Sequence, residues 1–285
     1  MPRVCRAPVG ELKRRSGHRH PGPLDPWIRV TWLPADAGVT VGSGAEGVLP
    51  VRNPDKGAAA AETVRAAAPG STVSVRNLDL ASLASIRAFT DGMRDEGRPV
   101  HILINNAGVM APPTRHVTRD GMELQFGTNH IGHVALTAGL LPLLRAGQAR
   151  VTTMSSSAAR YAKIDWTDLQ GERKYSAVRA YNLSKLATLH FGLELDRRSR
   201  AAGWGISSNV AHPGTTMTNL YAAGPNLGRS RPSPHEAVLR RLLRWGVLVQ
   251  TVDASPVVPP VCGGSSDKRG ITASARAEPA GQASA

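Results

Sequence analysis

The stretch VHILINNAG (Val100–Gly108) decides the fold, because it has the pattern of a buried strand that ends in turn residues. Its first half is almost continuously apolar, which is typical of a strand in a parallel sheet covered on both faces. The asparagines that follow can bond to neighbouring backbone groups, and Gly108 allows a close backbone approach. The stretch therefore predicts a covered strand with a turn at its carboxyl end.

Strand and helix patterns alternate on both sides of this stretch. Residues 53–70 are alanine-rich, with Pro54 in the first turn and a glycine behind, as expected of a helix. The other predicted elements are a strand over 71–80, a helix over 82–97, a buried helix over 128–144, a strand over 150–156, a long helix over 181–198 and a strand over 204–214. This alternation predicts the α/β class, with a Rossmann-like, doubly wound parallel sheet. Ligands bind at the carboxyl ends of the strands in such a sheet.

Composition indicates an ordinary soluble chain of 285 residues, of which 41% are hydrophobic and 20% are charged. Its two cysteines, Cys5 and Cys262, have no paired spacing, so we expect neither a disulfide framework nor a zinc site. The longest apolar run, residues 134–144, is too short to cross a bilayer, and no apolar run follows the basic N-terminus. We therefore expect a cytoplasmic protein without a transmembrane segment.

The net charge of +14 suggests a nucleic-acid partner, but its distribution argues against one. Residues 1–30 hold seven Lys or Arg against two acidic residues, and residues 229–285 hold eight against four, so most of the excess lies at the ends. No aromatic residues interleave with a basic stripe. We expect no nucleic-acid partner, and a basic protein that binds through its charged ends remains the third alternative.

Tyr181 and Lys185, in the segment AYNLSK, stand four residues apart on a predicted helix and so share one face. An ammonium beside a phenol stabilises the phenolate and brings the pKa of the tyrosine toward values that suit proton transfer. Such a pair also arises by chance on helix surfaces. Three other residues strengthen the interpretation of Tyr181 and Lys185 as a proton-transfer pair. Ser156 and Gly108 end two predicted strands, and Asn129 lies on the helix between them. Each feature alone is also typical of a turn or a cap.

The segments NLDL, NNAG, TNHIGH, MSSSA, AYNLSK and HPGTTMT, in this order, resemble the short-chain dehydrogenase/reductase family. The segment DLQGERKYSAVRAYNLSKLA is similar to its retinol-dehydrogenase-like and WW-domain-oxidoreductase-like branch. The resemblance runs from about Arg52 to about Asp253. It implies an oxidoreductase that moves hydride between a nicotinamide cofactor and a small-molecule alcohol or carbonyl substrate.

Four residues are catalytic if the resemblance holds. Tyr181 would be the general acid/base, and Lys185 would lower its pKa and bond the nicotinamide ribose. Ser156 would polarise the substrate oxygen, and Asn129 would hold a water in the proton relay. The residues implied at the cofactor are Arg52, Asp79, Leu80, Asn106, Ala107, Gly108, Tyr181, Lys185, Pro213, Gly214, Thr216 and Thr218.

The type of cofactor depends on Arg52. A basic residue just after the second strand favours the 2′-phosphate of NADP, whereas an acidic residue would bond the ribose hydroxyls of NAD. Arg52 therefore favours NADP(H) over NAD(H), and an exposed arginine without a ligand is the alternative.

The sequence ahead of Arg52 departs from the family, which needs a strand, a glycine-rich turn and a helix there. The expected place, residues 23–33, contains no glycine. The literal G-x-G-x-x-G at Gly42, Gly44 and Gly47 ends too close to Arg52 for a crossover helix. We therefore expect an irregular loop in GSGAEG, and a sheet whose first strand and glycine-rich turn are missing or replaced.

The predicted organisation has three parts: an atypical basic segment over 1–50, a Rossmann-like domain over 51–253 and a disordered tail over 254–285. We hypothesise that the two end segments are not the family's own termini. A degenerate relative with impaired cofactor binding and no catalysis is therefore the alternative function.

Two further features have local interpretations. His130 and His133 lack other ligands at metal spacing, so we expect packing or hydrogen bonding and no metal site. Residues 235–250 predict an amphipathic helix, either a packed surface helix or a substrate lid, and a lid would favour a lipophilic substrate. The helix that carries Tyr181 often pairs between subunits in the family that the chain resembles, which would give a homo-oligomer.

Overall fold

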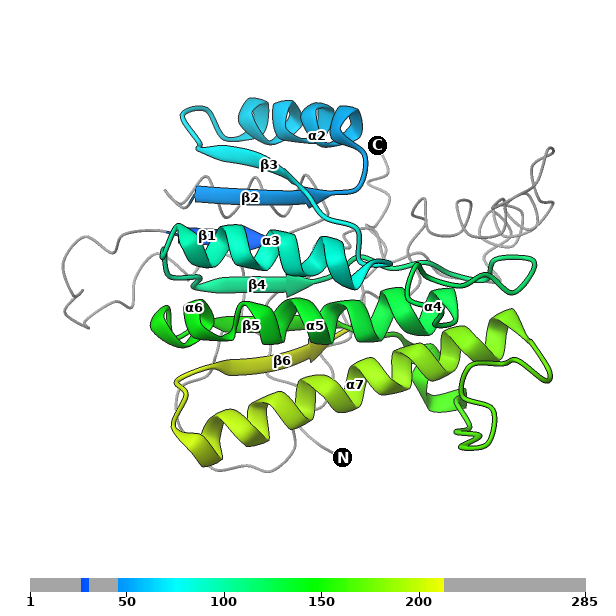
Figure 1. Cartoon of the computed structure of the whole chain (residues 1–285). Helices are drawn as coiled ribbons and strands as arrows, with labels where there is room; N and C mark the ends of the chain where they lie inside the picture. Colours follow the sequence, from blue (N-terminus) through cyan, green and yellow to red (C-terminus); the bar gives the residue numbers. More distant parts are fainter. Residues whose placement is uncertain (1–26, 31–45, 213–285) are drawn as a thin grey trace, which may run out of the picture.

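The computed structural model describes residues 27–30 and 46–212, and the statements below concern these residues (Figure 1). Its six strands form one sheet in the order β3-β2-β1-β4-β5-β6, and every neighbouring pair is parallel. The strands are β1 (Trp27–Val30), β2 (Glu46–Val51), β3 (Val73–Asn77), β4 (Ile102–Asn105), β5 (Arg150–Met154) and β6 (Ser207–Ala211). The predicted α/β class and parallel sheet are confirmed.

The helices alternate with the strands as predicted. They are α2 (Pro54–Ala67), α3 (Leu83–Asp95), α4 (Leu124–Phe126), the π-helical turn η1 (Gly127–Ile131), α5 (Gly132–Gly139), α6 (Leu141–Ala146), the short η2 (Ser157–Tyr161) and α7 (Ala177–Ala202). Side-chain caps fix where the main helices begin, because Asn53, Ser82 and Ser176 each accept a hydrogen bond from a backbone N–H of the first turn. Helix α7 is capped by Gly203, whose φ of 63° lies in the left-handed region that favours glycine.

The prediction of a missing or replaced first strand is wrong. Residues Trp27–Val30 form β1, which pairs with β2 on one side and β4 on the other, in the middle of the sheet. The strand is only four residues long, so pairing on both edges defines it better than its own sequence does. The sheet therefore begins ahead of residue 51, where the domain boundary was predicted.

The last glycine of the G-x-G-x-x-G motif lies in a strand and not in a phosphate-binding turn. Gly47 lies within β2, and its N–H donates to Thr72 O, so the third glycine of the motif belongs to a strand. Gly47 is therefore not part of a strand-to-helix turn. The prediction of an irregular loop over the whole of GSGAEG is also wrong at this residue, because Gly47 belongs to β2. Gly42 and Gly44 lie outside the described residues.

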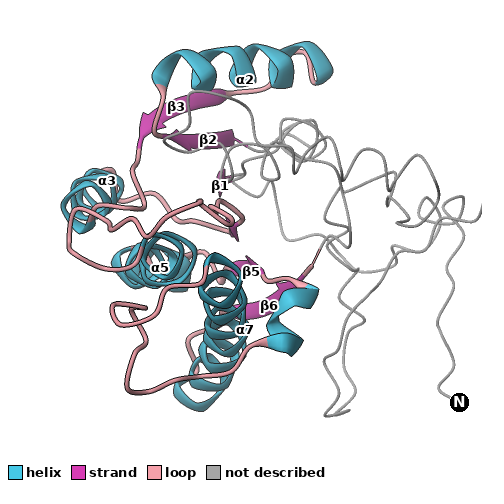
Figure 2. Ribbon diagram, turned by 90° about the vertical axis from the view of Figure 1, so that its right-hand side faces the viewer, coloured by secondary structure: helices cyan, strands magenta, loops and turns pink. Residues whose placement is uncertain are grey.

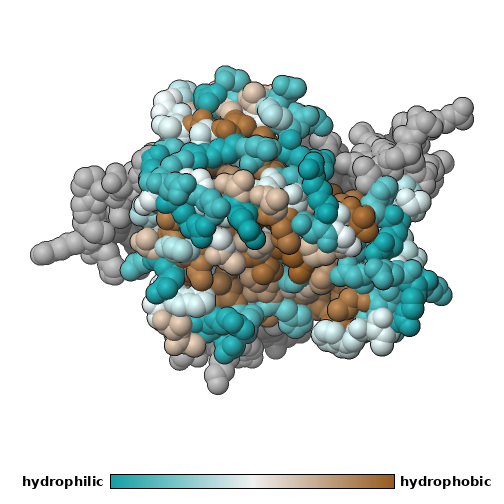
Figure 3. Space-filling model, in the orientation of Figure 1, coloured by the Kyte–Doolittle hydropathy of each residue, from teal (hydrophilic) through white to brown (hydrophobic). Residues whose placement is uncertain are grey.

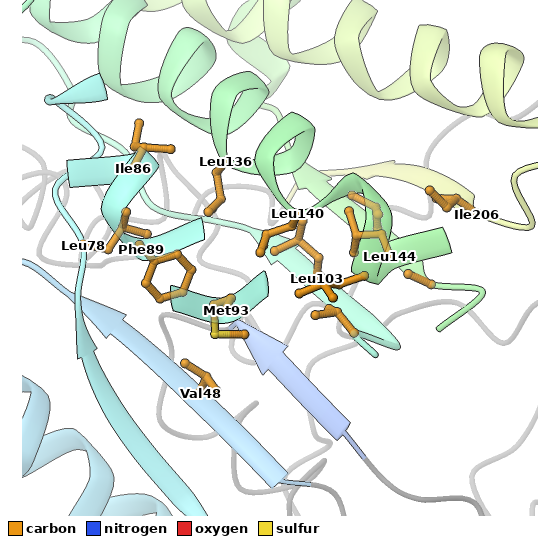
Figure 4. Packing of buried hydrophobic residues seen from close by; sticks show 14 of the residues in the cluster. Val48, Leu78, Ile86, Phe89, Met93, Leu103, Leu136, Leu140, Leu144 and Ile206 are labelled. Atoms are coloured by element: carbon orange, nitrogen blue, oxygen red, sulfur yellow. The ribbon is translucent and has the colours of Figure 1, made fainter. Parts of the chain in front are cut away.

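The described helices pack on both faces of the sheet, with α2 alone on the second face, where it covers β2 and β3. Consecutive strand residues point to opposite faces, and Val48 and Leu49 of β2 enter two different apolar clusters. Val48 joins the large core under α3, α5 and α6, together with Met93, Leu103 and Leu140 (Figure 4). Leu49 packs on α2 instead. Figures 1 and 2 show α3, α5 and α7 along one face, with α2 beyond β3 at the edge of the sheet.

A close contact sets the start of α5 against the loop after β3. A Cβ added at Gly132 would lie 2.5 Å from Leu80 O, so only glycine fits at this position. The loop that carries Asp79 and Leu80 is thereby held beside η1. Several predictions lie outside the described residues: the roles of Pro213, Gly214, Thr216 and Thr218, the helix over 235–250, and the tail.

Candidate active site

Lys185 is the buried centre of the site. It lies on α7 with only 5% of its surface exposed, and its Nζ donates to Met154 O at the end of β5, at 2.9 Å. Ser155 Oγ donates to Lys185 O at 2.8 Å, which fixes the helix on the strand end. Burial lowers the pKa of Lys185 to about 8, because the charged form has lost its water. The ammonium still predominates at neutral pH.

Tyr181 stands one turn before Lys185 on α7 and is partly exposed. Lys185 Nζ lies 5.8 Å from the centroid of the Tyr181 ring. The prediction that the two side chains share a helix face is therefore confirmed. This arrangement places a cation beside the phenol, as the stabilisation of a phenolate requires.

Ser156 lies two residues after the end of β5 and caps η2. Its Oγ accepts a hydrogen bond from Ala158 N at 3.2 Å, and η2 packs against α7. That bond uses a lone pair of the hydroxyl and leaves its proton able to donate. Figure 2 shows the short helix next to α7 at the ends of β5 and β6.

Asn129 lies in η1, where a π-turn widens the helix, and its buried side chain is held by protein groups. Its Oδ1 accepts from Val109 N at 2.7 Å, and its Nδ2 donates to Val109 O at 2.9 Å and Ser184 Oγ at 3.0 Å. Both amide donors are thereby used. Its main-chain carbonyl accepts from Thr188 Oγ1 at 3.1 Å, so a proton-relay water at this residue would bond the second lone pair of that carbonyl or of Oδ1.

Gly108 joins these groups to the end of β4. A Cβ added at Gly108 would lie 3.1 Å from Asn129 Oδ1 and 3.8 Å from Lys185 Nζ. Asn106 and Ala107 precede it in the same segment, so the residues predicted from NNAG come to the same place as the predicted acid/base pair.

The other predicted cofactor residues that the structure describes lie at the neighbouring strand ends. Arg52 follows β2 and is exposed. Asp79 and Leu80 follow β3 and are half-buried, and Asp79 Oδ1 accepts from Ala81 N at 3.0 Å. All belong to the carboxyl edge of one parallel sheet, which is where its ligands bind.

The two histidines have structural contacts. His133 Nε2 lies 2.8 Å from Ala107 O, and His130 packs between the rings of Phe126 and Phe191, with centroids 5.2 and 6.4 Å away. Burial lowers the pKa of each histidine to about 4, so both are neutral at pH 7. The predicted packing and hydrogen-bonding roles are confirmed.

Sequence reasoning missed a buried polar cluster beside this site. Gln125 Nε2 donates to Tyr175 OH at 3.2 Å, and Tyr175 OH donates to Glu123 Oε1 at 3.3 Å. Burial, followed by the Glu123 charge, raises the pKa of Tyr175 to about 12. The only sequence signal of this cluster was the segment ELQ, whose polar residues Glu123 and Gln125 stand where a helix begins.

Comparison with known proteins decides the family. The short chain dehydrogenase family matches residues 37–225, about two thirds of the chain. The chain belongs to this family. Its relatives in the retinol-dehydrogenase-like branch include retinol dehydrogenase 12 of Mus musculus, to which it is 43% identical over 178 residues. The aligned residues cover 62% of this chain and 55% of that relative. This chain is 46% identical over 149 residues to polyprenol dehydrogenase of Mus musculus, covering 50% and 44%. This short-chain dehydrogenase thus spans about half the length of these relatives.

Solved structures share the fold. A protein of Mycobacterium paratuberculosis is 40% identical, with a TM-score of 0.54 over 68% of this chain and 69% of that one. A short-chain dehydrogenase/reductase of Burkholderia phymatum in complex with NAD is 22% identical, with a TM-score of 0.59 over 80% and 81%. One from Sphingobium yanoikuyae in complex with NADPH is 20% identical, with a TM-score of 0.56 over 78% and 85%. The last two likenesses show the fold alone. Within residues 27–30 and 46–212, no helix is both long and apolar enough to span a membrane.

Proposed function

We propose that this short-chain dehydrogenase is an NADP(H)-dependent oxidoreductase that interconverts an alcohol and a carbonyl compound, with Tyr181 as the general acid/base. One observation carries the proposal. The Tyr181 phenol and the buried Lys185 ammonium lie one turn apart on α7, and Lys185 also bonds the end of β5 and lies next to Gly108 after β4.

The protein groups divide the proton chemistry among them. The nicotinamide cofactor supplies or takes up the hydride when it is bound. Tyr181 gives a proton to the substrate oxygen during reduction and takes it back during oxidation, while Ser156 donates a hydrogen bond to the same oxygen. Lys185 has three N–H donors, of which one goes to Met154 O, so two are available to stabilise the phenolate and bond the ribose.

The residues at the strand ends fit a nicotinamide cofactor. A Cβ at residue 108 would press on Asn129 Oδ1 and fill the space in front of the Lys185 ammonium, whereas glycine leaves that space to a ligand. Arg52, exposed directly after β2, offers a guanidinium for a 2′-phosphate, and this supports NADP(H) over NAD(H).

The proposed substrate is a lipophilic alcohol or its carbonyl counterpart. The two named mouse relatives carry the names of retinol and polyprenol, both long apolar alcohols. Their names support this substrate class for the present chain.

The test measures binding and turnover with the purified full-length chain. Titrations of NADPH and NADH, followed by fluorescence, give the two dissociation constants, and retinal, a short aliphatic aldehyde and a ketone are tested for turnover. Tyr181→Phe and Ser156→Ala should each lower kcat/KM by about 10²- to 10⁴-fold, while Ser157→Ala, at an exposed neighbour, should leave it unchanged. Turnover by a Tyr181→Phe variant at the parental rate would refute the assignment. Absence of cofactor binding would favour a degenerate relative.

We further propose that the enzyme is a homo-oligomer that pairs through α5 and α7. Figure 3 shows apolar residues gathered over α5 between the more polar α3 and α7, on the face that Figure 1 presents. Leu193 of α7 leaves 50% of its surface exposed. A contiguous apolar surface of this kind is typical of a protein–protein contact.

A further inference from the structure

A row of buried polar side chains runs along the helix that faces the end of β4. The row consists of four residues spaced four apart, Gln125, Asn129, His133 and Thr137, all at most 4% exposed. Each bonds a residue of the chain that runs from the last residue of β4 to Ala111, and those partners are spaced two apart. The pairs are Gln125 with Ala111, Asn129 with Val109, His133 with Ala107, and Thr137 with Asn105.

The two spacings match in length. Four helical residues rise about 6.0 Å, and two extended residues advance about 6.6 Å, so each side chain of the row can reach a partner in the facing chain. In a regular α-helix, residues four apart drift by about 40° around the axis at each step. The π-turn η1 offsets this drift, because Gly132 N–H bonds Gly127 O five residues back and the turn holds an extra residue. Asn129 lies within that turn, in the middle of the row.

Gln125 is the residue of the row that also bonds α7, the helix that carries Tyr181 and Lys185. Its Oε1 accepts from Ala111 N at 2.8 Å, and its Nε2 donates to Ala177 O at 2.9 Å and to Tyr175 OH at 3.2 Å. Ala177 is the first residue of α7 and stands one turn before Tyr181. Ala111 has a φ of 50°, in the left-handed region that favours glycine, so a specific contact has to hold its backbone.

Tyr175 supports the amide of Gln125 from the other side. Its hydroxyl accepts from Gln125 Nε2 and donates to Glu123 Oε1, while Glu123 Oε2 accepts from Phe126 N at 2.7 Å. The high pKa of Tyr175, about 12, keeps the hydroxyl protonated at neutral pH, so it remains a donor. The orientation of the Gln125 amide is therefore fixed by three protein segments: the chain after β4, the loop before α7, and α7 itself.

We propose that Gln125 is a positioning residue that sets the distance between segment 106–111 and the first turn of α7, and so between the bound nicotinamide and Tyr181. The inference rests on the proposed function, since segment 106–111 lines the cofactor only if the protein binds one. Gln125 itself touches neither cofactor nor substrate in this role; it acts through Ala111 and Ala177.

The test compares variants at two buried residues of the same row. Gln125→Met keeps the length of the side chain and removes its three hydrogen bonds, and Thr137→Val removes one bond at the far end of the row, away from α7. Gln125→Met should lower kcat by about 10- to 100-fold and weaken NADPH binding, with little change in the KM for the carbonyl substrate. Thr137→Val should lower the melting temperature but leave kcat and the NADPH dissociation constant within about twofold.

Hydrogen exchange provides a readout that does not need activity. Peptides covering 106–113 and 176–182 should exchange about tenfold faster in Gln125→Met than in the parent, and Thr137→Val should not alter them. If the parent neither binds NADPH nor turns over, the proposed function fails, yet the exchange rates still test the role of Gln125. Equal exchange and equal kcat in the two variants would overturn the proposal.

Tyr175→Phe is the second variant, for the case in which Gln125→Met does not fold. It keeps the ring and removes only the hydroxyl that orients Gln125. We expect a two- to tenfold lower kcat, as the loss of about one hydrogen bond allows, and faster exchange in 176–182. A parental kcat and exchange pattern in Tyr175→Phe, together with an unfolded Gln125→Met, would mean that Gln125 serves stability alone.

Discussion

Replacing Lys185 by methionine should raise the stability of the protein near pH 7 while it abolishes the proposed activity. Methionine approximates the length of the lysine stem and places no charge in the interior. Lys185 is 5% exposed, and within the described residues its Nζ donates to the neutral Met154 O, so its ammonium has exchanged water for a carbonyl. The substitution relieves this loss of solvation.

The size of the effect follows from the pKa. Burial lowers the pKa of Lys185 from 10.5 to about 8, which corresponds to about 3 kcal/mol of destabilisation when the group is charged in both states. The hydrogen bond to Met154 O, about 1 kcal/mol, is lost in the variant. The free energy of unfolding should therefore increase by about 2 kcal/mol at pH 7, or roughly 4–8 °C in melting temperature.

The sign of the pH dependence is fixed by the same values. Between pH 8 and 10.5 the unfolded chain binds more protons at Lys185 than the native one, so the stability of the parent rises with pH in this window relative to the variant. Near pH 10 the destabilisation has fallen to about 1 kcal/mol, which the hydrogen bond offsets. The gain from Lys185→Met should therefore vanish by about pH 10.

Urea unfolding of both proteins at pH 7 and pH 10 measures these differences. Lys163→Met, at an exposed lysine, is the control and should change the free energy of unfolding by less than about 0.5 kcal/mol at either pH. A Lys185→Met variant that is less stable than the parent at pH 7, or whose stability difference is the same at both pH values, would refute the reasoning.

Three other outcomes are expected. Gly147→Ala should destabilise the protein by about 2 kcal/mol or more, because the new Cβ would lie 2.2 Å from Val100 O. Gly92→Ala, at an open helix position, should instead stabilise it by about 0.5–1 kcal/mol, and thermal unfolding measures both changes. Leu193→Glu should shift the sedimentation coefficient to that of a monomer, and an unchanged oligomer would exclude this face of α7. Arg52→Glu should weaken NADPH binding about 10- to 100-fold while NADH binding changes little; equal losses for both cofactors would remove Arg52 from the 2′-phosphate.

Local patterns were sufficient to predict most of the fold. The continuous apolar residues of β4 and the cap residues Asn53, Ser82 and Ser176 act within a few positions of themselves, so they can be recognised in sequence. Strand β1 was missed because the prediction relied on a glycine-rich turn as its marker. Its four residues become a strand through β2 and β4, which flank it on both sides.

The candidate site divides in the same way. Tyr181 and Lys185 were predicted because helical spacing alone brings them together. Gln125 was missed because its partners lie 14, 50 and 52 residues away along the chain, at Ala111, Tyr175 and Ala177. The polar pattern around Gln125 does not distinguish it from a surface glutamine, and only its position between the chain after β4 and α7 gives it a role.

The low pKa of Lys185 and the row of polar side chains are physically linked. Asn129 holds Val109, which keeps Gly108 beside the Lys185 ammonium, and we infer that this part of the chain contributes to the burial of the ammonium. Loosening the same chain through Gln125→Met should admit water and bring the pKa of Lys185 back toward 10.5. The stabilisation by Lys185→Met should then be smaller in the Gln125→Met background than in the parent, by about 1 kcal/mol or more in a double-mutant cycle. Strict additivity of the two substitutions would mean that Lys185 is desolvated by α7 and β5 alone.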